Sequence, residues 1–513
     1  MKPLASFVST VNAVNAKFIE SYPSPGIFMK PRFDNTYAAL PERFYSRQKP
    51  EPVSSPSTIV VNEPLARRLG FDPQWLKTEE GAEFGVGNRL LEGSDPIAMV
   101  YAGHQFGNWV PRLGDGRALL LGEVVDEEGE RFDIQLKGSG RTPYSRRGDG
   151  RAPLGPVVRE YLISEAMAAM GVPTTRALMA ATTGESVFRE TRLPGGVLVR
   201  VASSHIRIGT FEYFASQRDT EALQLLIDYV IDRHYPDLAG ATPIDLLRRV
   251  AEQQAELVAQ WQLLGFIHGV MNTDNMLLSG ETIDYGPCAF MNEYDPATVY
   301  SSIDRQGRYA FGNQPFITQW NISRLAHAFL ALPDGEELLD DAQKVVDDVR
   351  DLFRDAYGRG MAKKLGIAEF QESDWPLIED LLELMYETGS DYTLTFRGLT
   401  RLATSDDSDS DGSDPEASDD DLAKLTTLPD EFDPWIERWQ ARQTEEPANN
   451  PLFIPRNHLV EAAIDDAVER EDFSTFFDLL DVVKTPYDER SDWADFARPP
   501  KPDERVQATF CGT

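Results

Sequence analysis

Residues 266–287, FIHGVMNTDNMLLSGETIDYGP, contain oxygen-bearing side chains that suit metal and phosphate chemistry. Asn275 and Asp284 present an amide oxygen and a carboxylate, and Mg²⁺ prefers such hard ligands while keeping positions open for phosphate. The turn SGET between two apolar runs predicts a hairpin, which would bring the two side chains together. A pair that only caps a turn is the alternative for residues of these types.

The same segment has the spacing of a protein-kinase catalytic loop with one side chain replaced. His268 and Asn275 keep the His-to-Asn spacing of that loop, and Asp284-Tyr-Gly matches the kinase metal-binding Asp-Phe-Gly with Tyr for Phe. The position of the kinase catalytic base is Val270, which cannot accept a proton. The chain could therefore transfer phosphate with a displaced base, use a nucleotide in another reaction, or only bind one.

Lys137 is the only lysine between positions 77 and 344. It ends a predicted strand, and Glu160 lies on the helix that follows. Kinases use such a strand lysine and helix glutamate to hold an ammonium against nucleotide phosphates. The pattern alone also allows a surface lysine, a solvent-facing or helix-capping Glu160, and surface ion pairs for Arg200 and Arg207.

The turn Gly114-Asp115-Gly116 is a further candidate for phosphate binding. Glycines allow the backbone to approach a ligand closely, so that N–H groups can contact phosphate. The turn does not fit G-x-G-x-x-G, and the sequence contains no Walker A motif. This signal is weak when taken alone.

The elements that must position these residues predict an α+β fold. The segment 155–171 predicts a helix, with proline near its start and glycine at its end. Helices dominate after residue 204, which together with the preceding strands indicates a two-lobed plan. Four short apolar runs bounded by turn residues predict strands: 118–126, 131–138, 175–184 and 195–203.

We expect three parts in the chain: an N-terminal extension at 1–95, a strand-rich N-lobe at 96–203, and a helical C-lobe with a C-terminal tail at 204–513. The acidic segment 405–421, SDDSDSDGSDPEASDDD, has too few apolar residues to bury a core and predicts a disordered insertion. Dense aspartate could instead bind Ca²⁺, but the segment lacks the glutamate that ends an EF-hand loop.

Composition limits the possible partners. The 513 residues are 41% hydrophobic and 26% charged, as in soluble globular proteins, and the formal net charge is −34. This charge argues against an extended nucleic-acid groove. No apolar run is long enough to span a membrane and no signal peptide is evident, so a cytoplasmic protein without a membrane partner is expected. Two cysteines exclude a disulfide scaffold and a Cys-rich zinc site.

Four long motifs resemble the selenoprotein O family of protein-kinase-like adenylyltransferases. They are YAGHQFGNWVPRLGDGRALLLGE, DIQLKGSGRTPYSRRGDGRAPLGPVVREYLISEAM, VRVASSHIRIGTFEYFA, and HGVMNTDNM with IDYGPCAFM. The resemblance extends from about residue 20 to the last residues, and the acidic insertion is peculiar to this chain. It implies a protein-kinase-like two-lobed fold and transfer of AMP from ATP to Ser, Thr or Tyr hydroxyls of proteins.

The resemblance also implies roles for individual residues. ATP would bind flipped relative to kinases, so that the α-phosphorus faces the acceptor. Asp274 corresponds to the catalytic carboxylate, which would accept the hydroxyl proton or orient the nucleophile. Asn275 and Asp284 would hold Mg²⁺, or Mn²⁺, against the phosphates. The residues that match nucleotide-contacting positions are Gly114, Gly116, Arg117, Lys137, Asp149, Gly150, Glu160, Arg200, Arg207 and Asp284.

The two cysteines gain a role by the same resemblance. Family members often carry selenocysteine or cysteine at the third-last position, which is Cys511 here, and Cys288 follows Asp-Tyr-Gly-Pro. A bridge between them would close a large loop, and in a reducing cytoplasm it would act as a redox switch rather than a structural bond. Two unrelated thiols are the alternative.

The sequence therefore predicts a protein adenylyltransferase whose partners are ATP and proteins modified on hydroxyls. Whether this chain is itself one of those proteins is left open by the sequence. An ordinary phosphotransferase that uses Asp274 as the displaced base is one alternative. A catalytically inactive nucleotide-binding scaffold is another.

Overall fold

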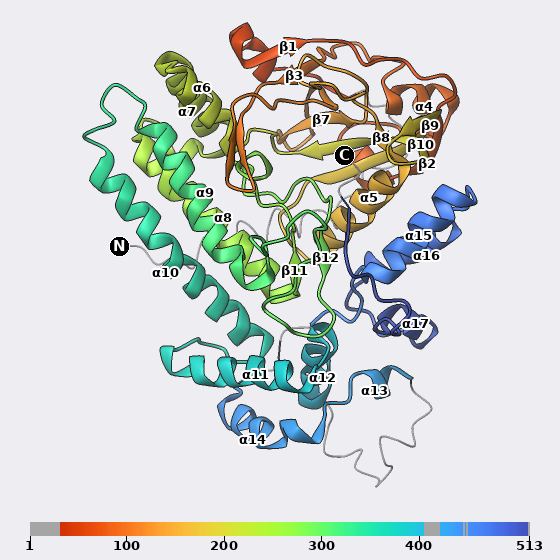
Figure 1. Ribbon diagram of the computed structural model, residues 1–513, viewed down its shortest axis with the longest axis vertical. Coiled ribbons are helices and arrows are strands. Elements are labelled where there is room, and N and C mark those ends of the chain that lie inside the picture. The colour runs from red at the N-terminus through yellow and green to blue at the C-terminus, as the bar shows by residue number, and fades with distance from the viewer. Residues whose placement is uncertain (1–30, 405–420, 445–446, 448–449, 511–513) are drawn as a thin grey trace.

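The computed structural model describes residues 31–404, 421–444, 447 and 450–510 (Figure 1). The predicted α+β class is confirmed, because a strand-rich part adjoins a larger helical part. Of the acidic segment, 405–420 lies outside the described residues, and Asp421 begins the short helix α13 (Asp421–Leu425). No helix in the described part of the chain has the length and apolar character to cross a bilayer.

The main sheet is antiparallel throughout the described residues, in the order β1-β3-β6-β7-β10-β9-β2, with β8 beside β10. β4 pairs with β5 and β11 with β12 in two small separate sheets. The strands are β1 (Tyr45–Arg47), β2 (Ser57–Val61), β3 (Ile97–Met99), β4 (Gly103–Gln105), β5 (Asn108–Val110), β6 (Ala118–Val125), β7 (Arg131–Lys137), β8 (Ala152–Pro153), β9 (Arg176–Phe188), β10 (Arg192–Ala202), β11 (Phe266–Ile267) and β12 (Ala289–Phe290).

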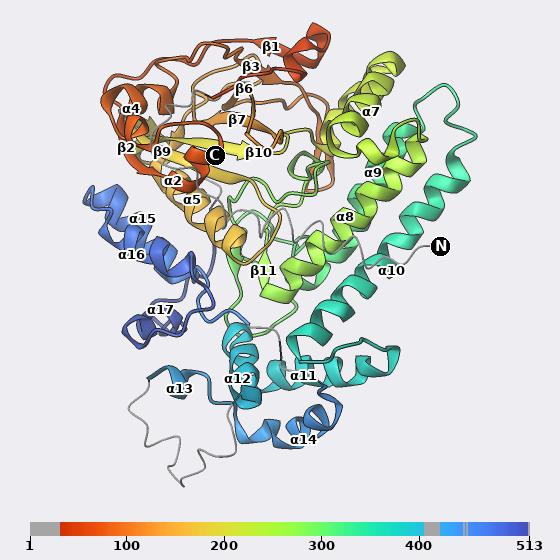
Figure 2. The ribbon, with the colours of Figure 1, turned by 180° about the vertical axis from the view of Figure 1, so that it is seen from behind.

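Helices cover both faces of the sheet. Alternation along β10 places Val197, Val199 and Val201 in the apolar cluster formed with α2 (Glu63–Arg68), α3 (Pro73–Leu76) and α4 (Glu79–Val86). The opposite face packs on the buried helix α5 (Leu154–Ala169), as Figure 2 shows from behind. The four predicted strands and the predicted helix are therefore all present.

The segment assigned to an N-terminal extension contributes to the sheet. Its strands β1 and β2 are the two outer strands of the order given above. The boundaries at 95/96 and 203/204 stay predictions, but the residues from 45 to 61 are part of the framework that holds the strands of the site.

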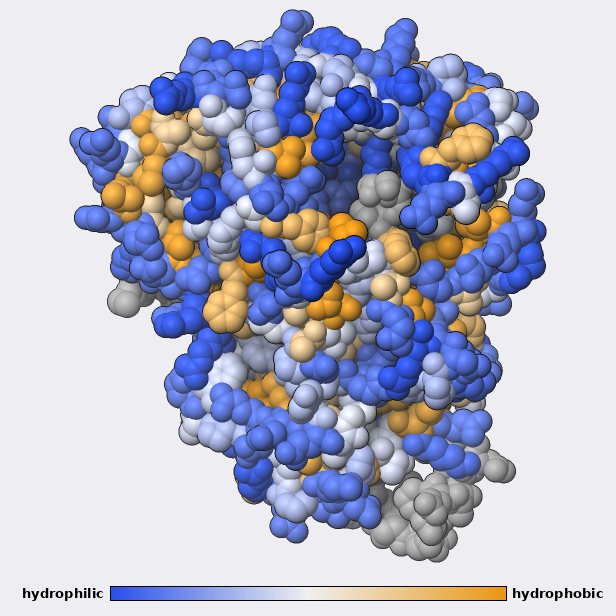
Figure 3. Space-filling view, viewed as in Figure 1, coloured by the Kyte–Doolittle hydropathy of each residue, from blue (hydrophilic) through white to orange (hydrophobic). Residues whose placement is uncertain are grey.

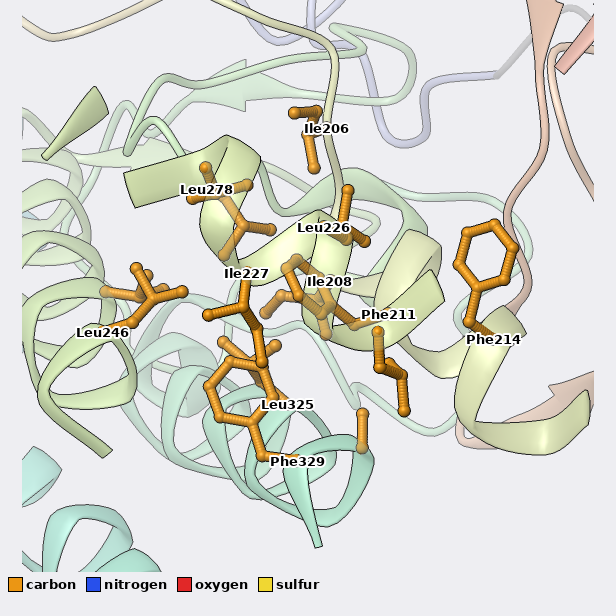
Figure 4. Close-up of a cluster of buried hydrophobic side chains, with 14 of the residues drawn as sticks. Ile206, Ile208, Phe211, Phe214, Leu226, Ile227, Leu246, Leu278, Leu325 and Phe329 are labelled. Carbon is orange, nitrogen blue, oxygen red and sulfur yellow. The ribbon is translucent and has the colours of Figure 1, made fainter. Parts of the chain in front are cut away.

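Helices build the larger part around an apolar cluster that is shown in Figure 4. Ile206 and Ile208 lie in this cluster, so their burial fixes the backbone on both sides of Arg207. Leu278 belongs to the same cluster, and its N–H donates to the Ile206 carbonyl at 2.9 Å. The longer helices of this part are α6 (Ile208–Gln217), α7 (Thr220–His234), α8 (Pro243–Leu264), α9 (Gln314–Phe329) and α10 (Leu339–Lys364).

The C-terminal helices return to the strand-rich part. α15 (Asn457–Glu469) and α16 (Ser474–Val483) pack on α5, and the rings of Tyr161 and Phe476 lie 5.7 Å apart (Figures 1 and 2). Arg159 of α5 forms an ion pair with Glu461. The remaining helices of this region are α11 (Trp375–Thr388), α12 (Tyr392–Thr404), α14 (Asp433–Arg442) and α17 (Ala494–Ala497).

Lys364, at the end of α10, is buried against aromatic rings and provides a test of this packing. Its Nζ lies 4.1 Å from the centre of the Phe396 ring, and burial lowers the pKa of the Lys364 ammonium from 10.5 to about 7. Because the folded state disfavours the charged form, Lys364 destabilises the protein below pH 7, and this cost disappears as the pH rises toward 10.5.

We therefore expect Lys364→Met to raise the melting temperature at pH 7, by an amount equivalent to roughly 2–4 kcal/mol, with a smaller gain at pH 10. Thermal unfolding at both pH values checks this, and the exposed neighbour Lys363→Met is the control. A gain that is equal at both pH values would contradict the account.

Candidate active site

A cavity of about 890 Å³ opens between the sheet, α5 and the segments 270–275 and 284–287. The molecule is hollowed on the face that Figure 3 shows. Nine of the residues that line the cavity are Arg or Lys and five are Asp or Glu, whereas the whole chain has a formal net charge of −34. A positive cavity in an acidic protein favours an anionic ligand, and arginine and lysine suit phosphate oxygens.

The predicted pair of strand lysine and helix glutamate is formed. Lys137 Nζ donates to Glu160 Oε2, and Arg200 Nη1 donates to Glu160 Oε1 at 3.0 Å. Arg200 lies opposite Gln135 and Leu198 opposite Lys137, so the two cations leave the same face of the sheet. Arg200 is 2% exposed, and Glu160 is also buried. The alternatives of a solvent-facing Glu160 and a surface ion pair for Arg200 are therefore wrong.

Asp284 is held by three cations. Its Oδ1 accepts hydrogen bonds from Lys137 Nζ at 3.1 Å and Arg200 Nη1 at 2.6 Å, and its Oδ2 accepts from Arg207 Nη1 at 2.8 Å. Burial alone would raise the pKa of the Asp284 carboxyl, but the three positive charges hold it well below its usual range. Asp284 also has a φ of +62°, which is rare outside glycine and concentrates at functional sites.

The predicted hairpin between residues 275 and 286 is wrong. Leu277 forms a bridge with Arg207, and Thr282 forms a bridge with Thr174, so each apolar run pairs with a distant segment instead of with the other run. Both residues are fully buried and have partners on neighbouring elements, which a local turn signal cannot reveal. Asn275 and Asp284 nevertheless line the same cavity, as the hairpin was expected to achieve.

Asp274 carries a carboxylate that is only partly hydrogen-bonded. It lies on the short helix η5 (Thr273–Asn275), is 7% exposed, and accepts a hydrogen bond at Oδ2 from Gln105 Nε2 at 3.3 Å. Its Oδ1 is buried and has no hydrogen-bond partner among the described residues. Burial raises the pKa of Asp274 to about 6, against the opposing charge of Arg207. A carboxylate of this kind can accept a proton from a bound hydroxyl.

Asn275 and Asp284, the two side chains expected to hold a divalent cation, both line the cavity. Asn275 donates its Nδ2 to the Val270 carbonyl at 2.9 Å, and this hydrogen bond does not use its Oδ1. In the described part of the chain, no group of three or more His, Cys, Asp or Glu side chains could hold a metal ion. A cation at this position would therefore need Asn275, Asp284 and the phosphates of a nucleotide together.

His268 has a structural role in this region. It is fully buried, its Nε2 lies 2.9 Å from the Ile283 carbonyl, and its Nδ1 accepts from the Val270 N–H at 3.3 Å. Burial lowers the pKa of His268, so the ring is neutral. The imidazole thereby links the chain before Val270 to the residue that precedes Asp284.

The glycine turn does not offer free N–H groups to a ligand, which corrects the expectation from the sequence. Gly114 N–H donates to the Tyr101 carbonyl, Asp115 N–H to the Met99 carbonyl, and Gly116 N–H to the Gly114 carbonyl. The glycines serve packing, since a Cβ at Gly114 would overlap the Tyr144 ring. Gly114, Gly116 and the following Arg117 do line the cavity.

The loop 141–151 forms another wall of the cavity and contains two of the predicted nucleotide contacts. Asp149 accepts a hydrogen bond from Arg189 Nη1 at 2.9 Å, and both side chains line the cavity. Gly150 has a φ of +68° and lies so close to Gly140 that a Cβ would overlap the Gly140 carbonyl. The structure thus brings all predicted site residues outside the cysteine pair to one cavity.

Sequence reasoning missed Tyr101 and Gln105, which shape this cavity, and gave no role to the side chain of Asp115 within the glycine turn. The Tyr101 ring lies 4.7 Å from the Arg207 guanidinium carbon, and Gln105 contacts Asp274. Asp115 is buried, and burial raises its pKa to about 6. All three residues lie within the quoted motif YAGHQFGNWVPRLGDGR, and that membership was the one signal that could have identified them.

The cysteine pair is only half described. Cys288 is fully buried, and Cys511 lies outside the described residues. Thr509 reaches the segment before Cys288, because its Oγ1 donates to the Pro287 carbonyl at 2.7 Å and its N–H donates to the Tyr300 carbonyl at 2.7 Å. A bridge between the two cysteines stays a prediction.

The fold and the cavity define an α+β protein with a large, cation-rich cavity that contains one under-bonded carboxylate. A family model described as protein adenylyltransferase SelO matches residues 27–484. Proteins from Rhodopseudomonas palustris strain BisB18 and Bradyrhizobium diazoefficiens are each 54% identical over 496 residues, which cover 94% of this chain and 99% of each relative. A protein from Rhizobium etli is 53% identical over 94% of this chain and 97% of the relative.

All three relatives are described as protein nucleotidyltransferase YdiU. The chain belongs to the SelO family, which confirms the resemblance seen in its motifs.

Proposed function

We propose that this chain is a protein adenylyltransferase that transfers AMP from ATP to Ser, Thr or Tyr hydroxyls of proteins and releases pyrophosphate. The match to the adenylyltransferase family over residues 27–484 carries the proposal. The names of the relatives describe nucleotidyl transfer, which does not favour a kinase or an inactive scaffold.

The geometry suggests a separate role for each side chain in the transfer reaction. Lys137, Arg200 and Arg207 would bind the phosphate oxygens deep in the cavity. The acceptor oxygen attacks the α-phosphorus, the bond from that phosphorus to the oxygen bridging to the β-phosphate breaks, and pyrophosphate leaves. Asp274 takes the proton of the acceptor hydroxyl. Val270 then needs no carboxylate, because the acceptor arrives beside Asp274.

Asn275 and Asp284 would hold Mg²⁺ or Mn²⁺ in the loaded enzyme. A bound divalent cation would neutralise the phosphate charge that the cationic side chains neutralise only in part. Asp284 also keeps Lys137, Arg200 and Arg207 in place through its hydrogen bonds.

We also propose that the fold is protein-kinase-like and two-lobed, with lobes at 96–203 and 204–513. The Lys137–Glu160 ion pair between β7 and α5 and the Asp284-Tyr-Gly turn at the cavity support this proposal.

ATP labelled separately at the α- and γ-phosphates tests the function. With Mg²⁺ and then Mn²⁺, we expect label from the α position alone to enter protein, together with the mass of AMP. Label from the γ position alone would identify a kinase. Label from neither position, with ATP still bound, would identify a scaffold.

Gly103 provides a test of how Asp274 is positioned. A Cβ at Gly103 would overlap Asp274 Oδ1, so Gly103→Ala must displace the carboxylate. We expect AMP transfer to fall roughly 10²-fold while ATP affinity is retained, since misplacement by about 1 Å has such an effect on rate. Single-turnover rates and calorimetric ATP titration measure the two quantities. A folded variant with an unchanged rate would remove Asp274 from the reaction.

A further inference from the structure

The cavity contains two groups of cations with different partners. The inner cations are Lys137, Arg200 and Arg207. They are buried and form ion pairs with Glu160 and Asp284. The outer arginines, Arg141, Arg146 and Arg147, line the mouth of the same cavity, are exposed, and form no ion pair with a carboxylate among the described residues. In a chain with 84 acidic residues, three such arginines close together in sequence present a local positive surface that the protein itself does not neutralise.

Hydrogen bonds hold the loop that carries these arginines. Gly140 N–H donates to the Gly150 carbonyl at 3.0 Å and closes the base of the loop. Thr142 Oγ1 donates to the Asp115 carbonyl at 2.7 Å, and Ser145 Oγ donates to the Gly116 carbonyl. Because the loop is tied to the glycine turn at two points, its arginines are presented from an ordered backbone, which lowers the entropic cost of binding.

Two large apolar side chains accompany the arginines. Phe188, at the end of β9, is 71% exposed, and Ile303 is 59% exposed, and both line the cavity. Apolar side chains of this size are seldom left in water beside a cavity unless another molecule covers them. The surface thus combines apolar contacts with a positive rim.

We propose that Arg141, Arg146 and Arg147, together with Phe188 and Ile303, bind the acceptor segment of the substrate protein and select a hydroxyl that is flanked by Asp or Glu. This inference rests on the proposed function, since it names the substrate class of the same site. The inner cations are the groups proposed to bind the phosphates of the nucleotide, so the outer arginines remain for the carboxylates of the acceptor segment. An acidic flank would direct the adjacent hydroxyl into the cavity toward Asp274.

Two matched peptides test the inference. One carries a serine flanked by aspartates, and the other has asparagines in their place. Fluorescence anisotropy measures the binding of each peptide in the presence of ATP and EDTA, so that binding is read independently of transfer, and label from α-labelled ATP with Mg²⁺ measures kcat/KM. We expect the acidic peptide to bind and react roughly tenfold better, with an advantage that falls as salt is added.

The double variant Arg146→Glu, Arg147→Glu should reverse this preference without changing the affinity for ATP. Arg218→Glu is the matched control, because Arg218 is also exposed, has a φ of +56° against +55° for Arg146, and does not line the cavity. The control should leave binding of both peptides unchanged.

Equal binding of the two peptides to the unaltered protein would overturn the inference, whether or not AMP is transferred. A loss of ATP affinity as large as the loss of peptide affinity in the double variant would also overturn it, because the arginines would then hold the nucleotide. Preferred binding of the acidic peptide without transfer of α-label to any protein would support the surface and contradict the proposed function instead.

Discussion

Asp274→Asn should slow AMP transfer severely while the protein still binds ATP. The substitution keeps the shape of the side chain and removes its ability to take a proton, so we expect the rate to fall roughly 10²–10⁴-fold, the range for a positioned acid–base group. ATP affinity should be retained, because the Asp274 side chain forms no ion pair with the inner cations. The substitution removes only one negative charge from the proposed phosphate site. Single-turnover transfer of α-label and calorimetric titration with ATP measure the two effects.

A buried aspartate elsewhere separates this effect from general destabilisation. Asp374 is also buried, accepts hydrogen bonds from Arg442 at 2.7 and 2.9 Å, and does not line the cavity. Asp374→Asn should lower the melting temperature and leave the rate per folded molecule unchanged. If Asp274→Asn retains the full rate of AMP transfer, another group is the base.

Lys137→Met should lower kcat/KM for ATP roughly 10²–10³-fold, as for the loss of one preorganised donor in a water-excluded site. Lys137 contacts both Glu160 and Asp284, so its loss removes a group proposed to bind phosphate and also loosens the carboxylate proposed to hold the metal. Lys137→Arg should not restore activity, because a wide planar guanidinium does not reproduce the compact ammonium that contacts both carboxylates.

Steady-state kinetics with varied ATP, together with melting temperatures, check the expectation for Lys137. The exposed Lys344→Met on α10 is the control and should change neither quantity. Full activity of Lys137→Arg would show that only a positive charge is needed, and full activity of Lys137→Met would remove Lys137 from the site.

The fold class and the main contacts of the site could be predicted because they follow local patterns. Short apolar runs bounded by turn residues marked β7 and β10, and helix-end signals marked α5. The pairing of Lys137 with Glu160 was then expected from the strand lysine and helix glutamate of protein kinases. The hairpin failed for the opposite reason. Leu277 and Thr282 are buried and pair with Arg207 and Thr174, and periodicity does not identify the partner of a fully buried run.

Details that depend on packing were also beyond the sequence. Glycine at 114 and 116 suggested a phosphate loop, but the glycines are required by the approach of Tyr144. Tyr101 and Gln105 are of common residue types and acquire their positions only from contacts with Arg207 and Asp274. The tertiary contacts, and not the motif alone, therefore determine which polar residues of the motif line the cavity.

The packing of α15 and α16 on α5 has a consequence for the newly made chain. Glu160 is carried by a helix whose outer side is covered by residues about 300 positions later, including Glu461, the partner of Arg159. A ribosome that has released only the sheet and α5 has therefore produced an incomplete support for the phosphate-binding cations. Competence should therefore appear late in synthesis, after residue 483 has emerged.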